Sequence, residues 1–72
     1  MEMIEGIQYI EGRLITEEDI NSPVTYIPSH ARGDASHKDA ERGTIKRVNK
    51  HGVFVDYIRN VCLTRADLLV WG

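Results

Sequence analysis

Five side chains that can bind a metal or move a proton lie close together in the middle of this sequence. They are His30, Asp34, His37, Asp39 and Glu41. Imidazole and carboxylate groups are ligands of zinc and other divalent ions, and a tetrahedral zinc site needs four ligands that converge. Their spacing is compact enough for one loop to wrap around an ion, but it matches no standard zinc motif. A metal site in this loop, with His30, Asp34, His37 and Asp39 as outside candidates, is therefore one hypothesis, and we expect no bound cofactor.

A second interpretation of the same residues is a loop held by its own hydrogen bonds. Aspartate side chains commonly accept hydrogen bonds from nearby backbone N–H groups in turns, which would suit Asp34 and Asp39. His30 and His37 would then connect the loop to the rest of the domain.

A hydrolase site is a weaker hypothesis, because no Ser, Thr or Cys stands in an activating context and the chain has no glycine-rich phosphate loop. We expect the protein not to be an enzyme.

The elements on either side of the loop are predicted to be strands. Val24–Ile27 is rich in β-branched residues, and Pro28 ends it because proline donates no hydrogen bond to a strand ladder. A second strand pattern follows Gly43. Loops as long as residues 29–42 are uncommon in small domains and are often functional. We therefore predict a binding site in this region, formed by Tyr26, His30, Asp34, His37, Asp39 and Glu41.

The remaining pattern also predicts short strands. The sequence Asn49-Lys-His-Gly52 is typical of a tight hairpin turn, and residues 53–58 form its second arm. Alternation in this arm places Phe54 on one face and Val55 on the other, with Phe54 a candidate core residue. A short strand at residues 61–63 and a helical turn capped by Thr64 precede the closing strand.

About five short strands with turns between them predict an all-β domain. Over residues 22–72 the order of elements resembles that of SH3-like barrels, in which a long loop follows the first strand and a single 3₁₀ turn precedes the last. Residues 1–21 form an N-terminal extension. Met3, Ile7, Ile10 and Leu14 have helical spacing, but Gly12 would suit the bend of a hairpin, and a loosely held arm is the third possibility.

Several segments also resemble a group of small, uncharacterised proteins of tailed phages and prophages. The resemblance lies in residues 26–34 and 37–43, in Val53-Phe-Val55, and in the Asp67-Leu68 ending. Members of that group often carry Cys where this chain has Ala40, so the metal hypothesis is weaker here if that Cys is a ligand. The resemblance implies a phage origin and a small β fold, but no established activity.

Charge and composition restrict the choice of partner. The chain has a net charge of −2, with six acidic side chains against Arg13 in residues 1–21 and an excess of basic ones after them. Four of these could bind nucleic acid along one strand and its turn: Arg42, Lys46, Arg47 and Lys50. A nucleic-acid-binding domain is usually strongly basic, so we treat nucleic acid as the alternative to a protein partner.

The length of 72 residues allows a single domain with a small core. Cys62 is the only cysteine, so no intrachain disulfide is possible, and its apolar surroundings indicate a small buried side chain. No apolar run reaches the length of a membrane helix and no signal peptide is recognisable, which predicts a cytoplasmic protein without a membrane partner. We expect a binding module for a host or phage protein, as a monomer or a homodimer.

Overall fold

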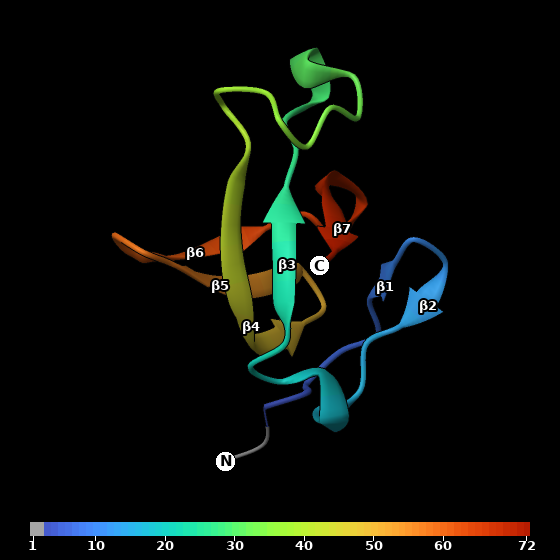
Figure 1. The fold of residues 1–72 in the computed structure, drawn as a ribbon. Coiled ribbons are helices and arrows are strands. Elements are labelled where there is room, and N and C mark those ends of the chain that lie inside the picture. The colour runs from blue at the N-terminus through green and yellow to red at the C-terminus, as the bar shows by residue number, and fades with distance from the viewer. Residues whose placement is uncertain (1–2) are drawn as a thin grey trace.

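The computed structural model describes residues 3–72, and it is mainly β (Figure 1). Five strands form one antiparallel sheet in the order β6-β5-β4-β3-β7. Their bounds are Pro23–Tyr26 for β3, Glu41–Asn49 for β4, Gly52–Tyr57 for β5, Val61–Thr64 for β6 and Leu69–Trp71 for β7. The predicted all-β class is confirmed.

Short 3₁₀ turns and one small hairpin complete the chain. The hairpin consists of β1 (Tyr9–Ile10) and β2 (Arg13–Leu14). The 3₁₀ turns are η1 (Glu17–Asp19), η2 (Ser29–Ala31) and η3 (Ala66–Leu68). No helix within residues 3–72 has both the length and the apolar character needed to cross a membrane.

The predicted turn between β4 and β5 is confirmed, and its side chains explain it. Asn49 pairs with Gly52 across the hairpin. The Asn49 side-chain oxygen accepts hydrogen bonds from the backbone N–H groups of His51, at 2.8 Å, and of Gly52, at 3.1 Å. Asparagine thus satisfies two donors that the turn would leave free, as it commonly does in turns.

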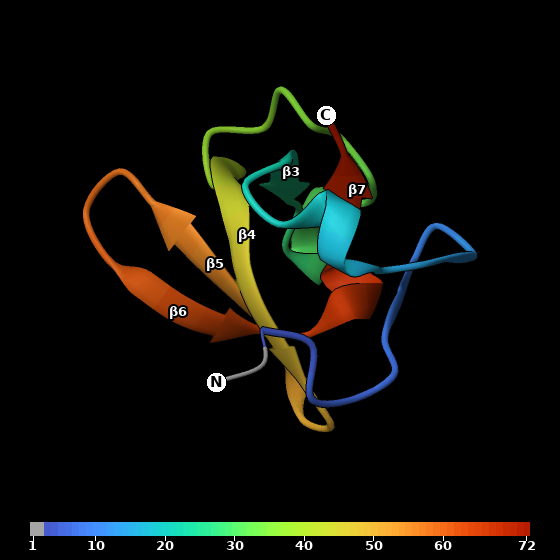
Figure 2. The same ribbon diagram turned by 90° about the horizontal axis from the view of Figure 1, so that it is seen from below.

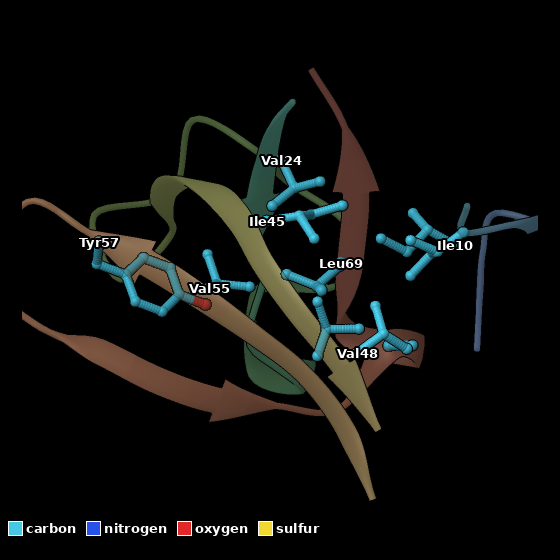
Figure 3. Packing of buried hydrophobic residues seen from close by; sticks show 10 residues of the cluster. Ile10, Val24, Ile45, Val48, Val55, Tyr57 and Leu69 are labelled. Carbon is cyan, nitrogen blue, oxygen red and sulfur yellow. The ribbon is translucent and has the colours of Figure 1, made fainter. Parts of the chain in front are cut away.

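The core lies on the inner face of the curved sheet (Figure 3). Its fully buried side chains come from β1, β3, β4 and β5 and from the segment after β2: Ile10, Ile15, Val24, Ile45, Val48, Val53 and Val55. Successive side chains of a strand point to opposite faces, and the buried Val53, Val55 and Tyr57 therefore leave Phe54 on the outer face. The prediction that Phe54 is a core residue is wrong, since it is only half-buried and lies beneath the Arg47 guanidinium.

The N-terminal segment forms a hairpin, one of its three predicted conformations. Glu11 and Gly12 make the turn with φ angles of 52° and 80°, a pair of positive values typical of two-residue hairpins. The helical alternative is wrong, because Ile7 is 72% exposed whereas Ile10 is fully buried. The division into residues 1–21 and 22–72 stays a prediction, and its residues 1–2 lie outside the described part of the chain. Ile10 and Ile15 nevertheless pack into the same core as the sheet.

Gly6 allows the N-terminal segment to cross close to the end of β4. The Glu5 N–H donates to the Val48 carbonyl oxygen at 2.7 Å, and the Val48 N–H donates to the Met3 carbonyl oxygen at 2.8 Å. A Cβ atom on Gly6 would collide with the backbone of Asn49 and Lys50. Gly6 makes a helix in this segment less favourable, and the close approach of the two backbones is the reason that a glycine is needed there.

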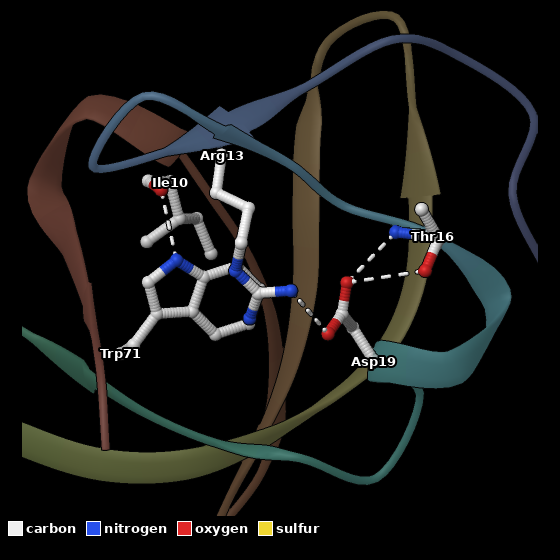
Figure 4. A network of polar contacts seen from close by, with 5 residues as sticks. All are labelled: Ile10, Arg13, Thr16, Asp19 and Trp71. Atoms are coloured by element: carbon white, nitrogen blue, oxygen red, sulfur yellow. Dashed lines mark hydrogen bonds and ion pairs between the residues drawn. The ribbon is translucent and has the colours of Figure 1, made fainter.

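A polar network joins the hairpin to η1 and to β7 (Figure 4). The Asp19 carboxylate accepts from the Thr16 backbone N–H at 2.9 Å and from the Arg13 guanidinium at 3.2 Å. The Arg13 guanidinium in turn lies 3.8 Å from the centre of the Trp71 ring. The Asp19 N–H also donates to the Thr16 carbonyl oxygen at 2.9 Å, so the two residues enclose the turn η1.

The prediction that Thr64 caps the helical turn before the closing strand is wrong. Residue Arg65 occupies the N-cap position of η3, and no side chain caps that turn. The Thr64 hydroxyl instead forms a buried 2.9 Å hydrogen bond with the Tyr57 hydroxyl. The Thr64 hydroxyl therefore bonds to Tyr57 on β5, whereas the local sequence predicted that it would cap the turn.

Candidate functional site

The long loop between β3 and β4 projects beyond the sheet, at the top of Figure 1. Its first residues form η2, and Arg32 and Gly33 then reverse the chain with φ angles of 53° and 80°. Backbone hydrogen bonds from Asp34 to Ala31 and from His37 to Asp34 continue the turns. The loop is thus a chain of consecutive tight turns, which fixes where its side chains point.

These turns bring His30, His37 and Asp39 together. His30 Nε2 lies 2.7 Å from Asp39 Oδ2, and the two imidazole rings meet edge to face with centroids 5.4 Å apart. His37 Nδ1 accepts a 3.0 Å hydrogen bond from the Asp39 backbone N–H. One ligand atom from each of the three residues lies within 4.8 Å of the others. Three of the predicted loop residues therefore converge.

Asp34 does not belong to this cluster. Its carboxylate accepts from the Ser36 hydroxyl at 2.6 Å and from the Ser36 backbone N–H at 2.9 Å. These two hydrogen bonds hold the pKa of Asp34 below its ordinary value. The position of Asp34 matches the interpretation of a loop held by its own hydrogen bonds, and not that of a metal ligand.

Tyr26 and Glu41 lie at the base of the loop and line a separate groove of about 430 Å³. The other walls of this groove come from β5, β6 and the η3 segment, and include Tyr57, Cys62, Leu63, Thr64, Arg65 and Leu68. The six predicted binding residues therefore separate into three groups. His30, His37 and Asp39 form the loop cluster, Asp34 holds a turn of the loop, and Tyr26 and Glu41 line the groove.

Tyr57 forms the buried end of this groove. It is 7% exposed, and its hydroxyl is satisfied by Thr64. Burial raises the pKa of the Tyr57 phenol, and the hydrogen bond with Thr64 opposes that shift. Tyr57 therefore remains a neutral phenol at neutral pH, so the charges at the groove come from its more exposed walls.

One wall of the groove is the edge strand β6. The Tyr57 N–H donates to the Asn60 carbonyl oxygen at 2.8 Å, so these two residues are a hydrogen-bonded pair. Hydrogen-bonded and non-hydrogen-bonded pairs alternate along an antiparallel ladder. Cys62 is therefore hydrogen-bonded to β5, whereas Val61 and Leu63 direct their backbone N–H and C=O groups away from it. Within residues 3–72 no strand pairs with that side of β6.

The opposite edge of the sheet is covered. Figures 1 and 2 both place the β1–β2 hairpin on the side of β7 and the β5–β6 hairpin on the other side. The Trp71 backbone N–H on β7 donates to the Glu11 carboxylate at 2.7 Å. The chain thus protects one edge and leaves the other open, although an open edge is prone to pair with another strand.

Exposed apolar side chains accompany the open edge. Val61 is 54% exposed, Leu63 is 48% exposed, and Ile58 in the turn before β6 is completely exposed. Sequence reasoning missed these three residues as binding candidates. Their apolar character gave a signal for strand formation, but the sequence held no signal that β6 would be at the edge.

The four basic residues of the nucleic-acid hypothesis do not form a continuous free surface. Arg47 pairs with Glu5 at 2.6 Å, and Lys46 donates to the Asn21 side chain at 3.0 Å. Arg42 and Lys50 are exposed at opposite ends of β4. Two of the four cations are thus engaged by neighbouring side chains, and the other two lie far apart along the strand.

We found no match to this chain among models of protein families, curated proteins or solved structures.

Proposed function

We propose that the chain is a small, non-enzymatic accessory protein of a phage or prophage, which binds a host or phage protein in the host cytoplasm. The phage origin is supported by the residue strings at positions 26–34 and 37–43. A domain of SH3-like type is supported by the strand order β6-β5-β4-β3-β7, by the long loop after β3 and by η3 before β7.

The observation that carries the proposal of protein binding is the open edge of β6. Val61 and Leu63 expose both their apolar side chains and, from the strand register, their backbone polar groups. An extended peptide can add to such an edge, with its backbone pairing to the strand and alternate side chains entering pockets. The groove beside β6 supplies a pocket of that kind.

The occupant that suits this surface is an extended segment of another protein with alternating side chains. Side chains on one side of the segment would enter the groove toward Tyr26 and Tyr57. Those on the other side would pack near Val61 and Leu63, on the face that carries Phe54. Glu41 and Arg65 at the groove provide one charge of each sign, so the partner segment needs no strong net charge.

The test compares two leucine variants on opposite sides of the domain. Leu63→Lys places a charge on the open edge, which discourages strand addition. Leu14→Lys changes a similarly exposed leucine, at 43%, on the β1–β2 hairpin. A partner captured from host lysate should be identified, and its binding segment added to the isotopically labelled chain. We expect shift changes along β6 that are lost in Leu63→Lys and kept in Leu14→Lys.

Two other results would contradict binding through β6. Binding that survives Leu63→Lys, or shift changes confined to the β1–β2 side, would place the partner elsewhere. Retention on DNA resin that falls steeply with salt would favour the alternative, nucleic-acid binding through Arg42, Lys46, Arg47 and Lys50. A concentration-dependent dimer that dissociates in Leu63→Lys would make a second copy of this chain the occupant.

A further inference from the structure

The loop cluster of His30, His37 and Asp39 has no part in the proposed groove. It is formed by η2 and by the residues just before β4, and it extends into solvent with side-chain exposures of 62% for His30 and 47% for Asp39. The hydrogen bonds of Asp34 close a local turn with Ser36. The cluster instead links the start of the loop to its end, through the contact of His30 with Asp39.

We propose that His30, His37 and Asp39 form a binding site for one divalent transition-metal ion such as Zn²⁺. The donor set of two imidazoles and one carboxylate suits such ions. Ligands held about 2.1 Å from a tetrahedral ion lie about 3.4 Å from each other. The distances of Asp39 Oδ2 to His30 Nε2, 2.7 Å, and to His37 Nδ1, 3.9 Å, lie on either side of that value. The third pair of ligand atoms, on His30 and His37, lies within 4.8 Å, so rotation of the two imidazoles would bring all three ligands to one ion.

A bound ion would replace two hydrogen bonds of the cluster, the contact of His30 with Asp39 and that of the Asp39 N–H with His37. An ionised carboxylate only accepts hydrogen bonds, so His30 Nε2 carries the proton that lies between it and Asp39 Oδ2. His30 binds the ion in its other neutral tautomer, with the ring proton on Nδ1. His37 Nδ1 accepts a hydrogen bond from the Asp39 N–H, so that nitrogen is unprotonated, and its lone pair would exchange this hydrogen bond for the ion.

Three protein ligands leave at least one coordination position for water or for a group from a partner. Because His30 lies in η2 and Asp39 lies just before β4, the ion would connect the two ends of the loop. Binding would then order residues 30–39 without changing the sheet. This inference does not depend on the proposed function, because no ligand of the site lines the groove at β6.

The experiment is a titration of the full chain with Zn²⁺, followed by calorimetry and by amide chemical shifts. We expect one ion per chain, with shift changes confined to the loop. His30→Ala and His37→Ala should abolish saturable binding, and Asp39→Asn should weaken it by about tenfold or more. Co²⁺ serves as a second probe, because a visible absorption band reports nitrogen and oxygen ligands directly.

The matched control is His51→Ala. His51 is the third histidine of the chain and is exposed in the β4–β5 turn, outside the cluster. This variant should bind Zn²⁺ as the wild-type chain does. Absence of saturation at millimolar Zn²⁺ would overturn the site, and so would equal binding by His30→Ala, His37→Ala and the wild type. Circular dichroism of each variant shows that the fold is kept, which the exposure of the cluster leads us to expect.

Discussion

The indole N–H of Trp71 donates a 2.8 Å hydrogen bond to the carbonyl oxygen of Ile10, which joins β7 to β1. The two residues are 61 positions apart in the sequence. Ile10 is fully buried, and Trp71 packs against the core beneath the Arg13 guanidinium. The N-terminal hairpin is thus attached to the closing strand, and its contacts protect the edge of β7.

Trp71→Phe should therefore destabilise the domain by about 1–2 kcal/mol. It removes a half-buried hydrogen bond, which contributes about 1 kcal/mol, together with part of the ring that Arg13 covers. Urea denaturation measures the change. Tyr9→Phe is the control, because Tyr9 lies on the same hairpin and is 54% exposed. A Trp71→Phe variant as stable as the control would show that the hydrogen bond contributes nothing.

Tyr57→Phe and Thr64→Val should each cost about 1 kcal/mol, because each leaves the other hydroxyl buried without its partner. The double variant should cost less than the sum of the two, since neither hydroxyl then remains to be satisfied. Unfolding free energies of the four proteins complete the cycle. Strict additivity would mean that the two hydroxyls do not interact.

Asp19 should make stability depend on pH in the acid range. Hydrogen bonds from the Thr16 backbone and from Arg13 lower the pKa of Asp19 below its ordinary value of 3.8, against the effect of burial. A lowered folded-state pKa gives stability that is present above the unfolded-state pKa and is lost as the pH falls through the folded-state pKa. The carboxylate therefore stabilises the fold at neutral pH.

Asp19→Asn should be less stable than the wild type at about pH 7, by about 1 kcal/mol, as for the loss of a capping group. The difference should begin to shrink below about pH 4, where the unfolded-state carboxyl becomes neutral, and should be lost as the pH falls through the lower folded-state pKa. Urea denaturation at several pH values measures it. A difference that stays constant with pH would exclude the charge of Asp19 as the cause.

Asp34→Ala should loosen the loop and leave the sheet intact. The Ser36 amide loses its 2.9 Å hydrogen bond to the carboxylate, so its exchange with solvent should become faster. Amides of β4 and β5 should exchange as in the wild type. Hydrogen exchange followed by NMR measures both, and an unchanged Ser36 amide would show that another contact holds the loop.

Phe54→Ala should cost only about 1 kcal/mol, because Phe54 is half-buried on the outer face of β5. Ile45→Ala should cost about 2–5 kcal/mol, since Ile45 is fully buried and its truncation leaves a cavity. Thermal or urea denaturation compares the two variants. A larger loss for Phe54→Ala than for Ile45→Ala would return Phe54 to the core.

Much of the fold could be predicted because it depends on local signals. Pro28 ends a strand, Asn49 and Gly52 form a turn, and Gly12 forms a hairpin bend, all through the backbone geometry that these residues impose. The error at Phe54 has a different origin. Alternation correctly separated Phe54 from Val55, but side-chain size gave no information on which face the sheet would bury.

The candidate site divides in the same way. The sequence placed His30, His37 and Asp39 in one loop, but the convergence of the three depends on the positive φ angles of Arg32 and Gly33 and on the turns that follow. Glu41 was predicted to lie with them, but it begins β4 and lines the groove. Asp39 and Glu41 are close in the sequence, but their side chains belong to different sites because the chain changes from loop to strand between them.

By itself, the sequence determined the class of this domain, its turns and the loop that carries the histidines, because each of these depends on residues close together in the chain. The tertiary structure alone decided that β6 has a free edge, that Tyr57 and Thr64 satisfy each other, and that Trp71 joins β7 to the N-terminal hairpin. These features depend on strand order and on contacts between distant residues, which a local pattern does not encode.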